Sequence, residues 1–127
     1  MKELLEWIYD KLSIYSDTYY EDLERDETGK ATIDDIKIVY NIPNMLQVTD
    51  NKNRNDIPLI IDIWGRKDQV LEMEKIVEKI ELLEDETYRS DKLFLIVNKD
   101  RLFRINIPDE DKNIRRVKLQ FVIRKYK

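Results

Sequence analysis

The chain has 127 residues, of which 27 are acidic, 23 are basic and none is histidine or cysteine. This length fits one domain, and the 42% of hydrophobic residues can form a core beneath a strongly charged surface. Without cysteine there is no disulfide and no thiolate nucleophile, and without histidine there is no imidazole acid–base catalyst or Ser-His-Asp triad. Neither glycine belongs to a phosphate-binding motif, because Gly29 and Gly65 stand far apart in the chain.

The net charge of −4 conceals a polarised distribution. Residues 1–35 hold four basic and eleven acidic side chains, whereas residues 112–127 hold seven basic and no acidic ones. Such opposed ends favour electrostatic complementarity between copies of the chain or with a partner. The sequence begins with acidic residues in place of the apolar run of a signal peptide, and it has no long apolar stretch, so we expect an intracellular protein with no membrane contact.

The first half of the chain predicts one helix followed by strands. Apolar residues recur at helical spacing over residues 2–16, and the acidic residues 17–35 then read as a loop. Apolar and polar residues alternate over residues 36–42, which predicts a strand that stops at Pro43. Leu46 and Val48 suggest a short continuation. A polar loop over residues 49–56 precedes a strand over 57–64 that is apolar on both faces and therefore central.

The second half predicts one helix followed by three strands. Residues 69–84 carry an apolar stripe opposite a charged one, with Asp68 as the expected N-cap. Strands are expected over residues 93–97, 103–107 and 117–123, separated by turns at 98–100 and 109–113. The expected fold is one α+β domain over residues 1–127, in which two helices cover one face of a mainly antiparallel sheet of five to six strands.

Carboxylates are the only plentiful reactive groups, and two patterns among them suggest metal chemistry. A metal-dependent nuclease would place acids at strand ends with a nearby lysine, which suggests Asp62 together with Glu72, Glu74 and Lys75. The helical pattern puts Glu72 and Lys75 on the solvent side of the helix, so a salt-bridged Asp62 is the simpler interpretation. The acidic residues 109–113 match a calcium loop in composition alone, and a charged hairpin turn accounts for them better.

The last strand and Trp64 indicate a binding surface. Arg116, Lys118 and Arg124 alternate to one face of their strand, and Trp64 lies on the face of its own strand that the helices are not expected to cover. A basic face can bind nucleic acid, but the acidic total disfavours nonspecific DNA binding, so a protein partner is the preferred interpretation.

Three segments resemble one family. Residues 57–67 read IPLIIDIWGRK and lead directly into the main helix; residues 101–105 read RLFRI; and the closing strand at 115–123 reads RRVKLQFVI. This order is similar to the tail terminator (tail completion, tail-to-head joining) proteins of long-tailed bacteriophages and prophages. Those chains begin with a helix, carry a strand with an I-D-hydrophobic-W core before the main helix, and end in a strand of L-x-F-x-I form. The acidic segment after the first helix departs from the pattern and leaves its own role open.

The resemblance implies a non-enzymatic virion assembly protein without cofactors. It would form a homo-oligomeric ring, a hexamer by family resemblance, that caps the tail tube and joins it to the head connector. Its partners would be copies of itself, the tail tube protein and the head connector protein, with DNA passing through the ring without specific binding. It would act in the host cytoplasm during assembly and remain at the virion head–tail junction.

Two other hypotheses stay open beside the ring. One is a small α+β adaptor or regulatory domain that binds a single protein partner, and the other is the metal-dependent nuclease built on Asp62. The residues that we expect to contact a neighbouring subunit or partner share exposed charge or a large aromatic ring. They are Trp64, Lys52, Arg54, Asp109, Glu110, Asp111, Arg116 and Lys118.

Overall fold

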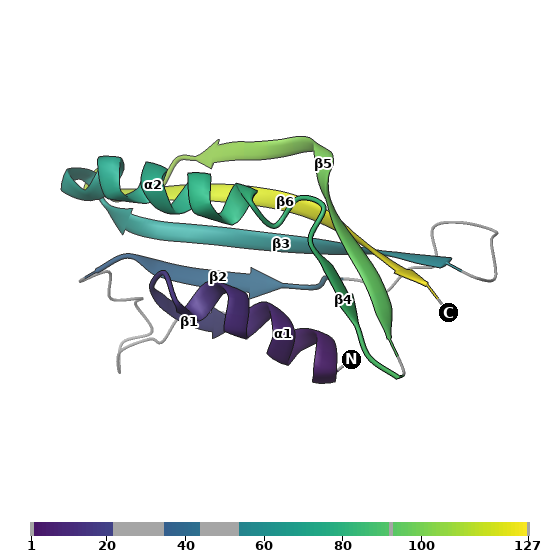
Figure 1. Cartoon of the computed structure of the whole chain (residues 1–127). Coiled ribbons are helices and arrows are strands. Elements are labelled where there is room, and N and C mark those ends of the chain that lie inside the picture. Colours follow the sequence, from purple (N-terminus) through teal and green to yellow (C-terminus); the bar gives the residue numbers. More distant parts are fainter. Residues whose placement is uncertain (1, 22–34, 44–53, 92, 127) are drawn as a thin grey trace.

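A computed structural model of the chain describes residues 2–21, 35–43, 54–91 and 93–126. Two α-helices, a short 3-10 turn and six strands make up this part (Figure 1). In chain order they are α1 (Lys2–Ser13), β1 (Asp17–Tyr20), β2 (Lys37–Asn41), β3 (Arg54–Arg66), η1 (Lys67–Gln69), α2 (Val70–Glu81), β4 (Thr87–Arg89), β5 (Phe94–Ile107) and β6 (Ile114–Tyr126).

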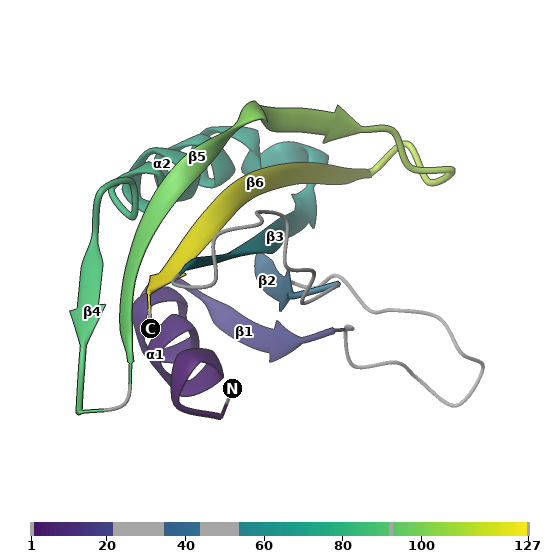
Figure 2. The same ribbon diagram turned by 90° about the vertical axis from the view of Figure 1, so that its right-hand side faces the viewer.

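All six strands form one curled sheet in the order β1-β2-β3-β6-β5-β4. Only β1 and β2 run parallel, and every other neighbouring pair is antiparallel. The long strands β3 and β6 pair along their whole length at the centre, and Figure 2 shows β5 and β6 bending around the same side. The α+β class, the two helices and the mainly antiparallel sheet are therefore as the sequence predicts.

Alternation along the central strands separates a buried face from an uncovered one. In β3, Leu59, Ile61 and Ile63 are almost fully buried, as are Leu119 and Phe121 in β6. The apolar stripes of the two helices close over these side chains, because helix residues three and four apart share one face. The buried residues contributed by the helices are Leu4, Ile8, Leu12, Met73, Val77 and Ile80.

Helix α1 bridges the two edges of the curled sheet. A short turn connects it to edge strand β1, and the centroid of its Trp7 ring lies 5.4 Å from that of Tyr88 in the opposite edge strand β4. The Tyr88 hydroxyl also donates a 2.6 Å hydrogen bond to Glu3. Figure 2 shows α1 between these edges, which explains why strands as short as β1 and β4 hold their places.

The structure corrects four local predictions. Residues 17–20 form β1 and residues 54–56 begin β3, where the sequence predicted loops. Residues 87–89, for which the sequence predicted no element, form β4 after the acidic turn. The two strands expected at 93–97 and 103–107 are one strand, β5, with a register shift between Lys99 and Arg104 in place of a turn. Asp68 is not the N-cap of α2, because the 3-10 turn makes Gln69 the cap residue.

Other predictions lie outside the described residues. They include the loop proposed within 17–35 apart from its ends, the short strand at Leu46 and Val48, and most of the polar loop at 49–56. Within the described part of the chain, neither helix has the length and hydrophobicity needed to cross a bilayer.

Candidate protein interface

A cluster around Trp64 occupies the sheet face that the helices leave uncovered. Trp64 and Arg116 are register partners on β3 and β6, and the guanidinium lies 4.7 Å from the indole centroid. Arg116 also donates a 3.1 Å hydrogen bond through Nε to Asp62, whose residue is only 8% exposed. Asp62 is thus the salt-bridged acid that the sequence suggested, and Arg116 is engaged by two partners at once.

Lys118 extends this cluster along β6. It is the register partner of both Asp62 on β3 and Ile105 on β5, which places it on the uncovered face between an acid and an apolar side chain. Half-buried Ile60 and Val122 continue the same face. The result is a sheet surface with an apolar centre and basic side chains, the composition of a protein interface more than of a solvated face.

The acidic residues predicted as contacts at 109–111 form the hairpin turn between β5 and β6. Asp109 Oδ1 accepts a hydrogen bond from the Asp111 amide at 2.9 Å, and Asp111 Oδ1 accepts one from the Asn113 amide at 2.9 Å. These carboxylates therefore hold the turn in shape, as expected of aspartates in turns. The prediction of a charged hairpin turn is confirmed.

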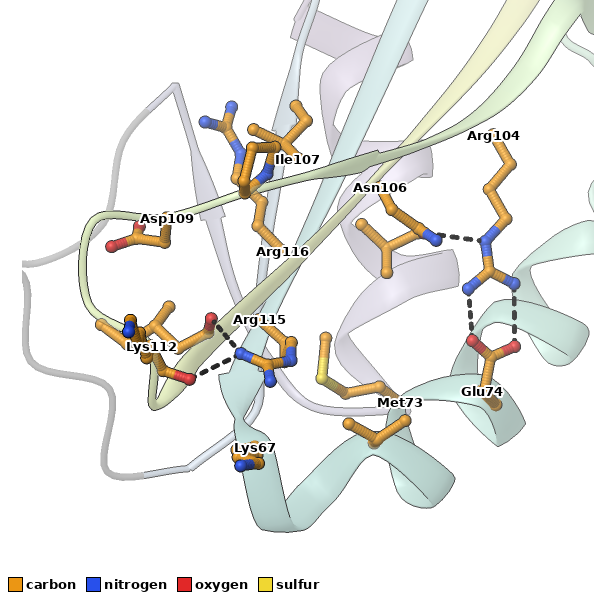
Figure 3. Close-up of a pocket in the computed structure, with 14 residues that line it drawn as sticks. Lys67, Met73, Glu74, Arg104, Asn106, Ile107, Asp109, Lys112, Arg115 and Arg116 are labelled. Carbon is orange, nitrogen blue, oxygen red and sulfur yellow. Dashed lines mark hydrogen bonds and ion pairs between the residues drawn. The ribbon is translucent and has the colours of Figure 1, made fainter.

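A cleft of about 640 Å³ opens between this hairpin and the start of α2 (Figure 3). Its apolar lining includes Val70, Met73 and Val117. One end is closed where the Lys67 amide donates a 2.7 Å hydrogen bond to the Asn113 carbonyl. The cleft is thus a built hollow between fixed elements, and it opens beside Arg116, which also lines it.

Three further cations line the cleft, namely Lys67, Lys112 and Arg115. Arg115 is held in place because its Nη1 donates to the carbonyls of Lys112 at 2.6 Å and Ile114 at 3.2 Å. Among the described residues, none of the three has a carboxylate ion-pair partner. An apolar hollow with unneutralised cations at its mouth suits an apolar group flanked by negative charge.

The opposite end of the cleft is bridged by Arg104 and Glu74. The guanidinium makes two hydrogen bonds to the carboxylate, one from Nη1 at 2.8 Å and a second, shorter one from Nη2. Arg104 holds the pKa of the Glu74 carboxyl below its ordinary value, mainly through these hydrogen bonds. The pair joins α2 to β5 and is already neutralised, so the free positive charge lies at the hairpin end.

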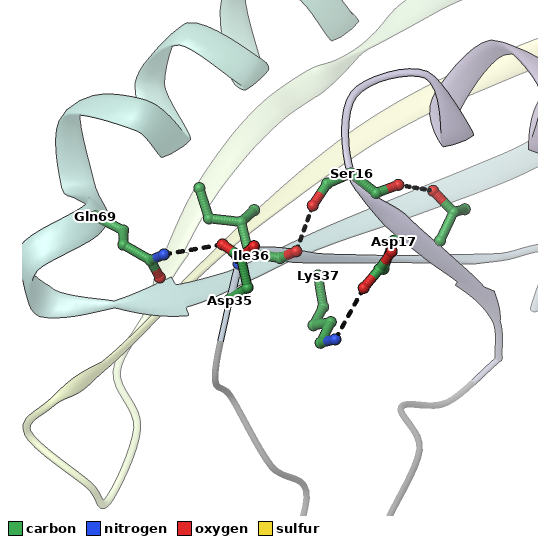
Figure 4. Close-up of polar contacts among 7 residues, drawn as sticks. Ser16, Asp17, Asp35, Ile36, Lys37 and Gln69 are labelled. Carbon is green, nitrogen blue, oxygen red and sulfur yellow. Dashed lines mark hydrogen bonds and ion pairs between the residues drawn. The ribbon is translucent and has the colours of Figure 1, made fainter.

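The start of α2, which forms one wall of the cleft, is anchored to the neighbouring strands (Figure 4). The buried Gln69 side chain accepts from the Arg66 amide at 2.9 Å and donates to Asp35 at 3.0 Å, just before β2. Further along, Ser16 donates to the Ile36 carbonyl and Lys37 pairs with Asp17 at 3.1 Å. The Gln69 contacts fix the start of α2, and with it Lys67 and Val70, relative to the sheet.

Acidic residues gather on the other side of the molecule. The two helices and residues 84–86 carry ten carboxylates and four lysines, and Lys99 and Arg104 of β5 neutralise Glu81 and Glu74. The uncovered sheet face carries six cations and three carboxylates among its described side chains. They are Lys37, Arg66, Arg89, Arg116, Lys118, Arg124, Asp17, Asp56 and Asp62. The charge polarity of the sequence is thus also a polarity in space.

The structure brings together Trp64, Arg116 and Lys118 from the predicted contact set, and it places residues 109–111 at the hairpin end. Arg54 begins β3, and Lys52 lies outside the described residues. Sequence reasoning missed the cleft, since Lys67, Lys112 and Arg115 belong to separate elements. Its only sequence signal was the closely spaced cations at 112 and 115.

The nuclease pattern is not assembled in the described residues. Asp62 pairs with Arg116, while Glu74 pairs with Arg104 on the other side of the sheet. No group of three or more potential metal ligands occurs among the described side chains. In comparisons with known proteins, no family model matches the chain, and no curated protein matches it.

Proposed function

We propose that this chain is a ring-forming structural protein of the tail-terminator type, which acts by assembly and not by catalysis. In this role it closes the end of the tail tube at the virion head–tail junction, contacts the tube and connector proteins, and lets DNA pass through the ring. Assembly takes place in the host cytoplasm. The proposal rests on the order of elements and motifs described above, together with the surfaces that the fold presents.

The observation that carries the proposal is the separation of unlike surfaces. The helix side is acidic, whereas β6 presents Arg116 and Lys118 beside the half-buried Trp64. A ring is built from contacts in which one patch meets a different patch on the next copy. Unlike charges on different sides of one molecule favour that geometry over a symmetric dimer, in which a patch would face the same patch of the second subunit.

Light scattering after size-exclusion chromatography, with negative-stain electron microscopy of the same fractions, tests the proposal. We expect a closed oligomer that appears as rings. A chain that stays monomeric at high concentration, in both low and high salt, would overturn the proposal.

The charge contribution is tested with a matched pair of variants. Lys118→Gln with Arg124→Glu removes positive charge from the uncovered face and should weaken assembly. Lys2→Gln with Lys75→Glu makes the same charge change on exposed lysines of the helices and should leave assembly intact. Arg116 is left unchanged, because its removal would strand the buried Asp62 carboxylate.

The cleft beside α2 favours a second candidate, a small adaptor domain that binds one protein partner as a monomer or dimer. The two candidates differ in the mass of the purified protein. An adaptor shows one or two copies without rings, whereas a terminator shows a larger closed assembly.

A further inference from the structure

The two ends of α2 carry complementary features. At its N-terminal end is the cleft with apolar walls and cations at its mouth. At its C-terminal end Leu82 projects with 71% of its surface exposed, and Glu84, Asp85 and Glu86 follow it immediately. We propose that the Leu82 end of α2 from one copy inserts into the cleft of the next copy.

The projecting end is a rigid feature. Leu83, next to Leu82, is buried, and the amides of Leu82 and Leu83 donate to the carbonyls of Lys79 and Ile80 at 3.2 and 2.9 Å. Glu84 accepts from the Lys99 amide at 2.5 Å, and Asp85 accepts from the Asn98 side chain at 3.1 Å. The leucine is therefore held outward, with carboxylates that are fixed in place yet exposed, so little entropy is lost on docking.

The cleft matches this feature in chemistry. Val70, Met73 and Val117 can receive an apolar side chain, while Lys67, Lys112 and Arg115 can meet the carboxylates around it. Asp109 also lines the cleft, but its single negative charge is outnumbered there by these three cations. Charge complementarity therefore selects an acid-flanked apolar group, and the chain itself presents one.

Leu82 cannot reach the cleft of its own copy, so the proposed contact joins two copies. Leu82 and the cleft lie at opposite ends of a 12-residue helix, about 18 Å apart along the axis at the usual rise per residue. A contact between unlike ends repeats from copy to copy, and it closes into a ring or continues as a filament. This inference rests on the proposed function and adds a specific contact between its subunits to the contribution of the uncovered sheet face.

Two variants disable the two halves of the contact separately. Leu82→Ser removes the apolar side chain, and Lys67→Glu with Lys112→Glu reverses the charge at the mouth of the cleft. Each variant should weaken assembly at least about tenfold. Leu71→Ser and the double variant Lys2→Glu with Lys75→Glu are the matched controls, since they make the same kinds of change at exposed helix residues outside the cleft. Circular dichroism should show that all variants keep the wild-type fold.

Mixing the two defective variants gives the decisive result. Each mixed pair retains one intact contact, so we expect a heterodimer that grows no further. Rings from the wild type that neither variant weakens would overturn this contact and leave the proposed function standing. A wild type that never assembles would overturn both.

Covalent trapping supplies an independent readout, because the chain has no cysteine. Leu82→Cys combined with Val70→Cys should form a ladder of disulfide-linked oligomers on mild oxidation. Neither single variant can give more than a dimer. A double variant without a ladder would contradict the assignment even if assembly itself persists.

Discussion

At the scale of single residues, the basic side chains of this protein divide into those whose ion pairs stabilise the fold and those that are available to a partner. Arg116 and Arg104 are each committed to a carboxylate from a different element, Asp62 and Glu74 respectively. Lys67 and Lys112 have no such partner among the described residues. Charge alone therefore does not identify a contact residue; the state of its local pairing does.

The Glu74 carboxyl gives a prediction for pH. Its pKa is lowered in the folded chain by Arg104, so its stabilising effect is present above the ordinary glutamate pKa and is lost as pH falls through the lowered value. Glu74→Gln should lower the free energy of unfolding by less than about 1 kcal/mol near neutral pH, because the pair is partly exposed. Urea unfolding should show this difference shrinking between about pH 5 and about pH 3. A difference that stays constant over this interval would show that Glu74 contributes by packing and not by charge. Glu78→Gln, an exposed change on the same helix, is the control.

At the scale of elements, the approach of α2 to the sheet depends on Gly65. A Cβ built at this position would lie 2.6 Å from the Met73 sulfur and 3.4 Å from Ile36. The missing side chain thus makes room for Met73, one of the buried residues of α2. The packing of this helix is set as much by the strand before it as by its own apolar stripe.

Gly65→Ala should therefore destabilise the protein by about 1–3 kcal/mol through overpacking. Backbone entropy alone would favour alanine in a strand, so the sign of the change separates the two effects. In a Met73→Ala background the cost of Gly65→Ala should fall by about 1 kcal/mol or more, since the clash is removed. Urea unfolding of the four proteins in this cycle measures the coupling, and equal costs in both backgrounds would exclude the contact.

The elements that the sequence predicts are those in which periodicity and burial agree. The stripes of α1 and α2 and the alternation of β6 all match the helix face of the sheet. The short edge strands were not predictable in this way, because β1 and β4 are held by α1 and by their neighbours and not by their own patterns. The turn expected at 98–100 is wrong for a related reason: Asn98 and Lys99 stay paired with β6, and the bulge that follows, between Lys99 and Arg104, shifts the register without breaking the strand. Among the site residues, Trp64 and Arg116 follow from alternation, whereas the cleft depends on tertiary placement.

At the scale of the whole molecule, two electrostatic effects oppose each other in any self-assembly. Every copy carries a net charge of −4, so copies repel at long range. The acidic C-terminal end of α2 and the cations at the mouth of the cleft attract at short range when they meet. The response to salt reports which of these effects dominates, because both are screened.

If local complementarity governs the contact, added salt should weaken assembly. The screening length falls from about 10 Å at about 0.1 M salt to about 3 Å at about 1 M, so surface attraction between copies is largely lost over this interval. Sedimentation velocity at several protein concentrations should then show the assembly midpoint rising with sodium chloride. If net repulsion governs instead, salt would strengthen assembly, and the charge argument for a ring would fail even where rings form. The variant with Lys67→Glu and Lys112→Glu sharpens the test. Any assembly that it retains should lose most of this salt dependence, while the control with Lys2→Glu and Lys75→Glu keeps it.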